Sequence, residues 1–312
     1  MYNFAIMGVG GYIAPRHLKA ITDTGNKIVV ACDPNDSVGI LDRYSLDIKF
    51  FKEPERFDRF LFKQHKKGDD EKVHFVSICT PNYLHDAHIR LALRNDCDAI
   101  CEKPLVINPW NLDALKELEE ETGRRIFTIM QLRYHEPLIN LKKEIENSKK
   151  RYSVEMTYIT GRGRWYYVSW KGSEEYSGGV ATNIGVHLFD LMIWLFGDVE
   201  KVSIFKRDEK SVSGFLSLKN ADVRWFLSLD PSFIPEEIVR KGKQTYRSIK
   251  IDEKEIEFSE GFTDLHTLVY KKILNNEGLG IEDARKSIEL VYKIRKEEIK
   301  PTTYGEVHPL LK

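Results

Sequence analysis

Hydrophobic and polar positions follow one pattern in the first half of the chain and another in the second. Up to about residue 128, short apolar runs alternate with stretches of helical length. The runs predict strands at residues 4–7, 27–32, 73–79 and 98–101, and the stretches predict helices at 17–23, 55–66, 84–94 and 111–121. Buried strands joined by helical crossovers favour a doubly wound parallel sheet of the α/β class.

From about residue 130 several apolar runs alternate with polar residues, as in strands with one exposed face. The pattern predicts strands at residues 154–160, 202–206, 212–218, 223–229, 247–251 and 255–258, and helices at 182–196, 263–275 and 283–298. We therefore expect two domains, 1–128 and 129–312, the second an α+β domain on a mainly antiparallel, open-faced sheet. An open sheet face needs a cover, which favours a homo-oligomer, a tetramer rather than a dimer.

Composition excludes several classes of protein. Lys+Arg and Asp+Glu both number 48, so net charge gives no support for a nucleic-acid partner. No apolar run approaches the ~18 residues of a membrane span, and the first residues lack the basic region of a signal peptide. We expect a cytoplasmic protein with no membrane partner. The four cysteines form no metal-type CxxC pair, and His85 and His88 have no acidic third ligand in an obvious motif, so no metal is predicted.

A glycine-rich turn follows the first predicted strand. Gly8, Gly10 and Gly11 precede Tyr12 and Ile13, and such turns let backbone N–H groups approach a pyrophosphate at a helix N-terminus. The fit to GxGxxG is imperfect because Ile13 stands at the third glycine position, and an ordinary glycine turn is the alternative.

The end of the second predicted strand carries Asp33. An acidic residue here can accept hydrogen bonds from the ribose hydroxyls of a dinucleotide and would repel a 2′-phosphate. The following residues, Pro34 and Asn35, supply no cation for that phosphate. The sequence therefore favours NAD over NADP, with a turn or helix cap as the alternative role of Asp33.

Two further segments carry groups suited to proton transfer. Glu102-Lys103-Pro104 follows a strand of the first sheet, where Lys103 can project toward a bound ligand unless it is a solvated surface lysine. Asn183, His187 and Asp190 are spaced to share one face of the predicted helix after Gly178-Gly179. An imidazole titrates near neutral pH, so His187 is a candidate proton carrier, with a buried core histidine as the alternative.

The chain resembles the Gfo/Idh/MocA oxidoreductases over its whole length. Three motifs occur in the order found in that family: the glycine turn, Glu-Lys-Pro and the GG…H…D helix. The resemblance implies a Rossmann fold, an NAD cofactor, and catalytic positions at Lys103 and His187. Asn183 stands where the family commonly has Asp, which puts the usual Asp–His dyad in doubt. The resemblance also implies cofactor contacts at Thr80, Pro81, Asn82, His85, Glu102, Lys103 and Gln131.

Residues 11–19, 132–135, 163–171 and 261–266 resemble one branch, the UDP-N-acetylglucosaminuronate 3-dehydrogenases of bacterial surface-sugar synthesis. The resemblance implies oxidation of the sugar C3 hydroxyl, in lipopolysaccharide (O-antigen) biosynthesis, with a 2-oxo acid as an oxidant for NADH. A UDP-sugar acid carries a diphosphate and a carboxylate, which arginine and lysine can bind. The candidate substrate residues are Lys103, Arg162, Arg164, Tyr166, Ser169, Lys171, Asn183, His187 and Arg247, with Arg133, His135 and Ser248 as weaker ones.

Two alternatives stay open. One is another sugar or inositol dehydrogenase of the same family. The other is a non-catalytic dinucleotide sensor, against which the presence of both Lys103 and His187 argues.

Overall fold

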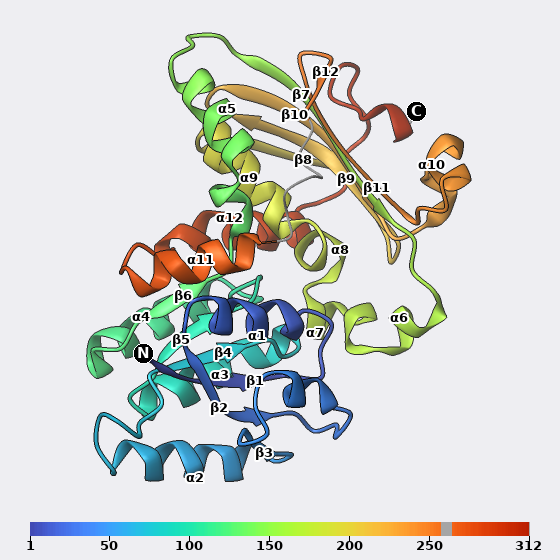
Figure 1. The fold of residues 1–312 in the computed structure, drawn as a ribbon. Coiled ribbons are helices and arrows are strands. Elements are labelled where there is room, and N and C mark those ends of the chain that lie inside the picture. The colour runs from blue at the N-terminus through green and yellow to red at the C-terminus, as the bar shows by residue number, and fades with distance from the viewer. Residues whose placement is uncertain (257–263, 312) are drawn as a thin grey trace. The chain divides into compact units, whose positions relative to one another are not determined.

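The computed structural model describes residues 1–256 and 264–311, which form two compact units (Figure 1). Unit 1 contains residues 1–134 and 264–285, and unit 2 contains residues 135–256 and 286–311. The sequence predicted domains 1–128 and 129–312, so residues 264–285 differ from the expectation by joining the first unit. The reason is packing: Val269, Tyr270 and Ile273 belong to the hydrophobic core of unit 1.

Unit 1 is built on a six-stranded sheet in which every pair of neighbours is parallel, in the order β3-β2-β1-β4-β5-β6. Its strands are β1 (Asn3–Met7), β2 (Lys27–Cys32), β3 (Lys49–Phe51), β4 (Phe75–Ile78), β5 (Asp98–Cys101) and β6 (Ile126–Thr128). The inner strands are buried almost throughout, which explains their unbroken apolar runs. The predicted doubly wound parallel sheet is confirmed.

The helices of unit 1 connect its strands, except the last, which comes from a later part of the chain (Figure 1). They are α1 (Ala14–Asp23), α2 (Pro54–His65), α3 (His85–Arg94), α4 (Trp110–Thr122) and α11 (Leu265–Leu274), with short 3₁₀ turns η1 (Gly39–Arg43), η2 (Asn82–Leu84) and η3 (Gln131–Tyr134). The helix α12 (Ile281–Lys296) contains the boundary between the two units.

Unit 2 contains a second six-stranded sheet, in the order β12-β11-β7-β10-β9-β8. Only β7 and β10 pair in parallel, so the sheet is mainly antiparallel as predicted. Its strands are β7 (Tyr152–Thr160), β8 (Val199–Arg207), β9 (Ser211–Leu218), β10 (Ala221–Ser228), β11 (Thr245–Ile251) and β12 (Lys254–Glu255). Residues 257–258 of the last predicted strand and 261–263 of the 261–266 motif lie outside the described residues.

The remaining elements of unit 2 are short except for two helices. They are α5 (Glu136–Glu146), α6 (Arg164–Val168), α7 (Glu174–Ser177), α8 (Gly179–Asn183), α9 (Val186–Phe196) and α10 (Glu236–Arg240), with 3₁₀ turns η4 (Trp170–Gly172), η5 (Pro231–Phe233) and η6 (Pro309–Leu311). Among the described residues no single helix is long and apolar enough to cross a membrane. Only the bent pair Glu174–Asn183 and Val186–Phe196 reaches that length together, and α9 is almost wholly buried within unit 2.

The two faces of the second sheet have different covers. Trp225 packs edge-to-face on Phe189 of α9, with ring centroids 5.1 Å apart. Its neighbour Phe226 points to the opposite face and packs on Phe233 and on His308 of the C-terminal segment. This segment, residues 299–311, also contributes Val307 and Leu311 to small apolar clusters on the sheet. Residues adjacent in a strand thus bury side chains against different layers.

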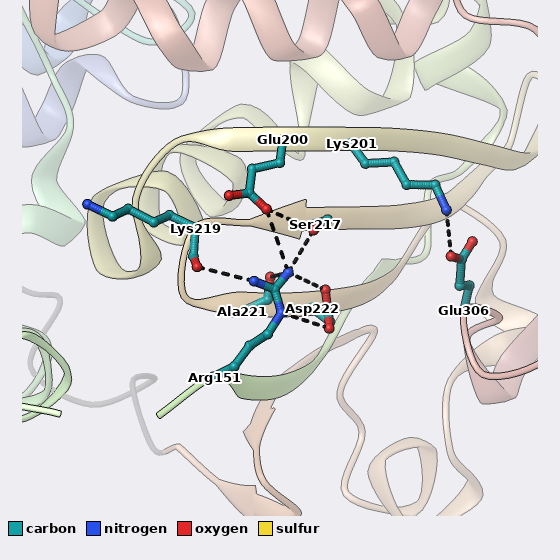
Figure 2. Close-up of polar contacts among 8 residues, drawn as sticks. All are labelled: Arg151, Glu200, Lys201, Ser217, Lys219, Ala221, Asp222 and Glu306. Atoms are coloured by element: carbon teal, nitrogen blue, oxygen red, sulfur yellow. Dashed lines mark hydrogen bonds and ion pairs between the residues drawn. The ribbon is translucent and has the colours of Figure 1, made fainter. Parts of the chain in front are cut away.

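Charged side chains join strands at one end of this sheet (Figure 2). Arg151 binds both carboxylate oxygens of Asp222, at 2.7 and 3.0 Å, and donates to the Ser217 hydroxyl at 2.7 Å. Lys201 of β8 pairs with Glu306 of the C-terminal segment at 2.6 Å. The segment is therefore held to the sheet by an ion pair as well as by apolar contacts.

Candidate functional site

The predicted cofactor residues of unit 1 gather at one edge of its sheet. Because all six strands are parallel, their carboxyl ends meet at that edge. The residues that follow those ends are Gly8, Gly10, Gly11, Tyr12 and Ile13 after β1, Asp33 after β2, Thr80, Pro81 and Asn82 after β4, Glu102 and Lys103 after β5, and Gln131 after β6.

The glycine turn after β1 passes close to the end of β4. Gly8 has a φ of +79°, and a Cβ at this position would lie 2.7 Å from the Cys79 carbonyl, so no side chain fits. The Gly11 N–H then donates to the Gly8 carbonyl oxygen at 3.0 Å. The helix α1 that follows has no side-chain hydrogen bond capping its N-terminus. Such a turn and helix end fit a pyrophosphate.

The Asp33 carboxylate is buried beside this turn. One oxygen accepts the Gly10 N–H and the other accepts the Asn35 N–H, both at 2.9 Å. A carboxylate oxygen has two acceptor positions, so each oxygen can take a further hydrogen bond. Asp33 can therefore accept hydrogen bonds from the ribose hydroxyls of a dinucleotide, and this role stays a prediction.

His85 joins two of the loops at this edge. Its Nδ1 lies 2.7 Å from the Pro104 carbonyl oxygen and its Nε2 lies 2.9 Å from the Thr80 carbonyl oxygen. Burial lowers the pKa of His85, and a neutral imidazole donates to one of these carbonyls at a time. His85 thus connects the loop that follows β4 to the loop that follows β5.

Gln131 and Glu102 differ in their contacts. The buried Oε1 of Gln131 has no hydrogen-bond partner among the described residues, so it is an acceptor suited to a ligand. Glu102 is buried with hydrogen bonds to its own unit: one oxygen lies near two histidines and the other accepts the Lys103 N–H at 3.2 Å. Lys103 itself is half-buried.

Two tyrosines organise the polar residues of unit 2. The Tyr158 hydroxyl accepts a hydrogen bond from Arg247 at 3.0 Å, and its ring meets the His187 ring edge-to-face at 5.9 Å. The Tyr166 hydroxyl accepts from the Asn183 amide at 2.6 Å, and the Arg162 guanidinium lies 5.9 Å from its ring centre.

Both rings are buried, and burial raises the pKa of Tyr166 despite the Asn183 bond. The structure thus brings Asn183 and Arg162 to one ring, and His187 and Arg247 to the other.

The predicted single helix at 182–196 is wrong. The structure divides it into α8, which ends at Asn183, and α9, which begins at Val186, with a 45° bend. Asn183 and His187 therefore do not share the face of one helix. The bend lies at Gly185, where a Cβ would come within 2.5 Å of both the Ala181 carbonyl and the Leu227 side chain. Helical spacing alone does not reveal this close contact.

The other predicted substrate residues lie near α6 and η4. Lys171 and Tyr166 line one pocket of unit 2, and the Lys171 amine lies 4.2 Å from the Trp170 ring centre. The Ser169 hydroxyl donates to the Tyr166 carbonyl at 2.8 Å, so it also shapes this turn. Arg164 is exposed at the start of α6.

The three weaker candidates have separate settings. Arg133 donates to the Asp283 carbonyl at 2.8 Å, within unit 1. Ser248 donates to Glu255 at 2.9 Å, and His135 is buried.

Sequence reasoning missed Tyr158, and it missed the roles of His17, His266 and Tyr270 around Glu102. Tyr158 lies in a correctly predicted strand but has no motif of its own. His17 and His266 lie in segments that resembled the branch, which is the one signal that could have singled them out. Their partners are far away in the chain, so spacing could not.

Comparison with known proteins supports both units. Residues 2–130 match the oxidoreductase family with an NAD-binding Rossmann fold, and residues 142–226 match the C-terminal alpha/beta domain of the same Gfo/Idh/MocA family. Inositol 2-dehydrogenase of Salmonella paratyphi B is 24% identical over 206 residues, which are 64% of this chain and 56% of that protein. The chain spans about a third to just over half the length of such curated relatives.

Two solved structures of the WlbA (WbpB) dehydrogenase from Thermus thermophilus are similar throughout. The one in complex with NAD and alpha-ketoglutarate is 48% identical, and the one in complex with NAD and UDP-GlcNAcA is 47% identical. Each has a TM-score of 0.95 and covers 99% of both chains. With the Rossmann sheet, its glycine turn and the second α/β unit all present, the chain belongs to the Gfo/Idh/MocA oxidoreductase family.

Proposed function

We propose that this protein is an NAD-dependent dehydrogenase that oxidises the C3 hydroxyl of UDP-N-acetyl-D-glucosaminuronic acid to the 3-keto sugar. The observation that carries the proposal is the similarity, over 99% of both chains, to a dehydrogenase in complex with NAD and UDP-GlcNAcA. We place the reaction in bacterial surface polysaccharide synthesis. A 2-oxo acid reoxidises NADH, in line with the alpha-ketoglutarate of the other complex.

In this proposal the chain's own residues bind the substrates and move one proton. Asp33 and the glycine turn would hold the dinucleotide, which would supply the hydride acceptor for the carbinol carbon. Lys103 and His187 take the hydroxyl proton and pass it toward solvent. Lys103 and His187 are the two candidates for the base, and the variants of each residue decide between them.

The charged groups near the two tyrosines suit an anionic sugar. Arg162 and Arg247 each contact a buried tyrosine, and Lys171 lines a pocket with Tyr166. Guanidinium and ammonium groups bind carboxylate and phosphate strongly, and tyrosine adds an apolar surface for the sugar.

The test compares UDP-N-acetylglucosaminuronate with UDP-N-acetylglucosamine, which has a hydroxymethyl group in place of the carboxylate. A charged hydrogen bond is worth roughly 1.5–3 kcal/mol, so the neutral sugar should be about 10–100-fold worse in kcat/KM. NADH absorbance measures turnover, in single turnover if copurified NADH interferes. Mass spectrometry after borodeuteride reduction locates the keto carbon.

Lys171→Met should reduce the difference in kcat/KM between the two sugars. The exposed Lys219→Met should leave that difference unchanged. Equal rates on both sugars would defeat the uronate assignment and leave a dehydrogenase. Turnover of inositol instead would favour another branch of the family. Binding of NAD without turnover of any sugar or inositol would favour a dinucleotide sensor.

A further inference from the structure

A buried polar cluster lies in unit 1, beneath the edge that carries the proposed NAD site. Its members are His17 of α1, Ser77 of β4, Glu102 after β5, and His266 and Tyr270 of α11. All five are buried, none more than 7% exposed. Four separate parts of the chain thus contribute polar groups to one buried cluster.

The distances connect these groups into one chain of hydrogen bonds. Glu102 Oε1 lies 3.0 Å from His17 Nε2 and 3.1 Å from His266 Nε2. His17 Nδ1 lies 2.7 Å from the Tyr270 hydroxyl, which lies 2.7 Å from the Ser77 hydroxyl. The second Glu102 oxygen accepts the Lys103 N–H at 3.2 Å. The carboxylate therefore receives three N–H groups, one of them from the lysine proposed to act on substrate.

The proton positions follow from what each group can donate. Burial alone would raise the pKa of Glu102, but the hydrogen bonds from His17 and His266 outweigh it and hold that pKa well below its usual range. An ionised carboxylate only accepts, so both Nε2 atoms carry protons. Burial lowers the pKa of His17, so the ring is neutral and its Nδ1 accepts the Tyr270 hydroxyl proton. Ser77 in turn donates to the Tyr270 oxygen.

The same three ligand atoms of His17, Glu102 and His266 lie within 4.8 Å of one another and could surround a metal ion. The hydrogen-bond assignment accounts for the cluster without one. Both imidazoles approach one carboxylate oxygen at hydrogen-bond distance, and each of these donors has an acceptor. A bound metal is therefore an outcome that the experiment must be able to detect.

We propose that His17, His266 and Tyr270 are positioning residues, which fix the Glu102 carboxylate and through it the backbone of Lys103. Because Glu102 is directed into the core and anchored there, the adjacent Lys103 is presented from a rigid point at the end of β5. The kinetic part of this inference rests on the proposed function, in which Lys103 acts on the substrate hydroxyl.

The first arm of the test does not depend on turnover. In protein labelled with ¹⁵N-histidine, NMR should show His17 as a neutral Nε2–H tautomer and should show a proton on Nε2 of His266. Tyr270→Phe removes the hydroxyl that donates to His17 Nδ1 and keeps the ring that packs in the core, so the Nδ1 resonance of His17 should shift while its Nε2 keeps the proton bound to Glu102. Hydrogen–deuterium exchange of the peptide that contains Lys103 should accelerate.

Tyr44→Phe, a tyrosine packed elsewhere on the same core, is the matched control and should change neither signal. The proposal is overturned by a doubly protonated or Nδ1–H His17, by stoichiometric metal in elemental analysis, or by unchanged exchange at Lys103 in Tyr270→Phe.

The second arm uses His17, where one replacement preserves the hydrogen-bond pattern. His17→Gln can donate to Glu102 and accept from Tyr270, whereas His17→Leu can do neither. We expect kcat within about threefold of wild type for Gln and a loss of about 10- to 100-fold for Leu, with NAD affinity and the KM for the sugar nearly unchanged. A loss of kcat confined to the Leu variant separates positioning from a general loss of folding, which circular dichroism checks.

Equal kcat in folded Gln and Leu variants would overturn the kinetic role. If Lys103→Ala leaves turnover unchanged, the proposed catalytic role of Lys103 fails instead, and the tautomer and exchange measurements still decide whether the cluster fixes its backbone.

Discussion

At the scale of single residues, Asp33 joins the dinucleotide turn to the end of β2 through its bond from Gly10. Asp33→Ala removes the proposed acceptor for the ribose hydroxyls and the charge expected to repel a 2′-phosphate. We expect NAD to bind about 10–100-fold more weakly, in proportion to one charged hydrogen bond, and the preference over NADP to narrow. Calorimetric titration of both cofactors measures this, with the exposed Asp70→Ala as control. A wild-type preference for NADP would contradict the role of Asp33.

Lys103 and His187 are the residues on which proton transfer is proposed to depend. Lys103→Ala and His187→Ala should each lower kcat by about 10²–10⁴, the usual contribution of a general acid–base group. Titrated NAD affinity should change little. Single-turnover NADH formation is the measurement, with Lys63→Ala and His65→Ala on the exposed side of α2 as controls. Near-normal kcat in both variants would contradict the assignment of Lys103 and His187 as proton carriers. A loss of kcat in one variant alone would identify the residue replaced there as the main proton carrier.

Gly8 and Gly25 form a matched pair for the turn after β1. Both have positive φ, +79° and +75°, but a Cβ on Gly8 meets the backbone at 2.7 Å while one on Gly25 meets nothing within 4 Å. Gly25→Ala should lose about 1–2 kcal/mol of unfolding free energy from backbone conformation alone. Gly8→Ala should lose more and bind NAD weakly. Urea unfolding measures the stability of both variants, and calorimetric titration measures their NAD affinity. Equal losses of unfolding free energy in the two variants would mean that the close contact at Gly8 is unimportant.

Sequence reasoning worked best where a residue's role depends on its immediate neighbours. Gly8, Asp33 and Lys103 each follow a short strand, and the parallel arrangement then brings them to one edge. Glu102 shows where it failed. Its partners His17 and His266 are separated by more than two hundred positions, and no local pattern indicates that they meet the same carboxylate.

At the scale of elements, the sequence did not predict β3, β6 or α5, and it predicted one helix where α8 and α9 are two. Residues 182–196 have the apolar spacing of one helix, yet the chain bends where Gly185 packs against Leu227. Spacing reports which positions are buried. It does not report that a side chain at Gly185 would collide with the Ala181 carbonyl and the Leu227 side chain, at the break between α8 and α9.

The C-terminal segment makes the stability of unit 2 depend on pH through His308. Burial, with Arg224 and Lys250 nearby, lowers the pKa of His308 to about 3 from 6.5. Unfolded chains bind the proton below pH 6.5 while the folded ring stays neutral, so this stability is present above 6.5 and is lost as the pH falls. Between pH 7.5 and 5 the loss should be about 2 kcal/mol.

Urea unfolding of wild type and His308→Gln at the two pH values measures it. The variant should show a smaller pH dependence, and the exposed His65→Gln should match wild type. If the free energy of unfolding changed equally with pH in wild type and in His308→Gln, the His308 ring would take up no proton on unfolding.

At the scale of the whole molecule, assembly is predicted from the second sheet. We expect a homo-oligomer, with a tetramer favoured over a dimer, joined mainly through unit 2. The apolar clusters between the C-terminal segment and one face of its sheet are small, and an open sheet face needs a cover. Light scattering at micromolar concentration should give a mass above 36.3 kDa. A clean monomer of wild type would count against the prediction.

The return of α11 to unit 1 bears on how the protein is made. During synthesis the first 134 residues leave the ribosome long before Val269, Tyr270 and Ile273, which complete their core. Until then the nascent unit exposes the apolar surface that α11 will cover, and Glu102 lacks the donor from His266. We therefore expect residues 1–134 alone to bury less apolar surface than they do in the folded chain, and to complete their packing only after α11 has been synthesised.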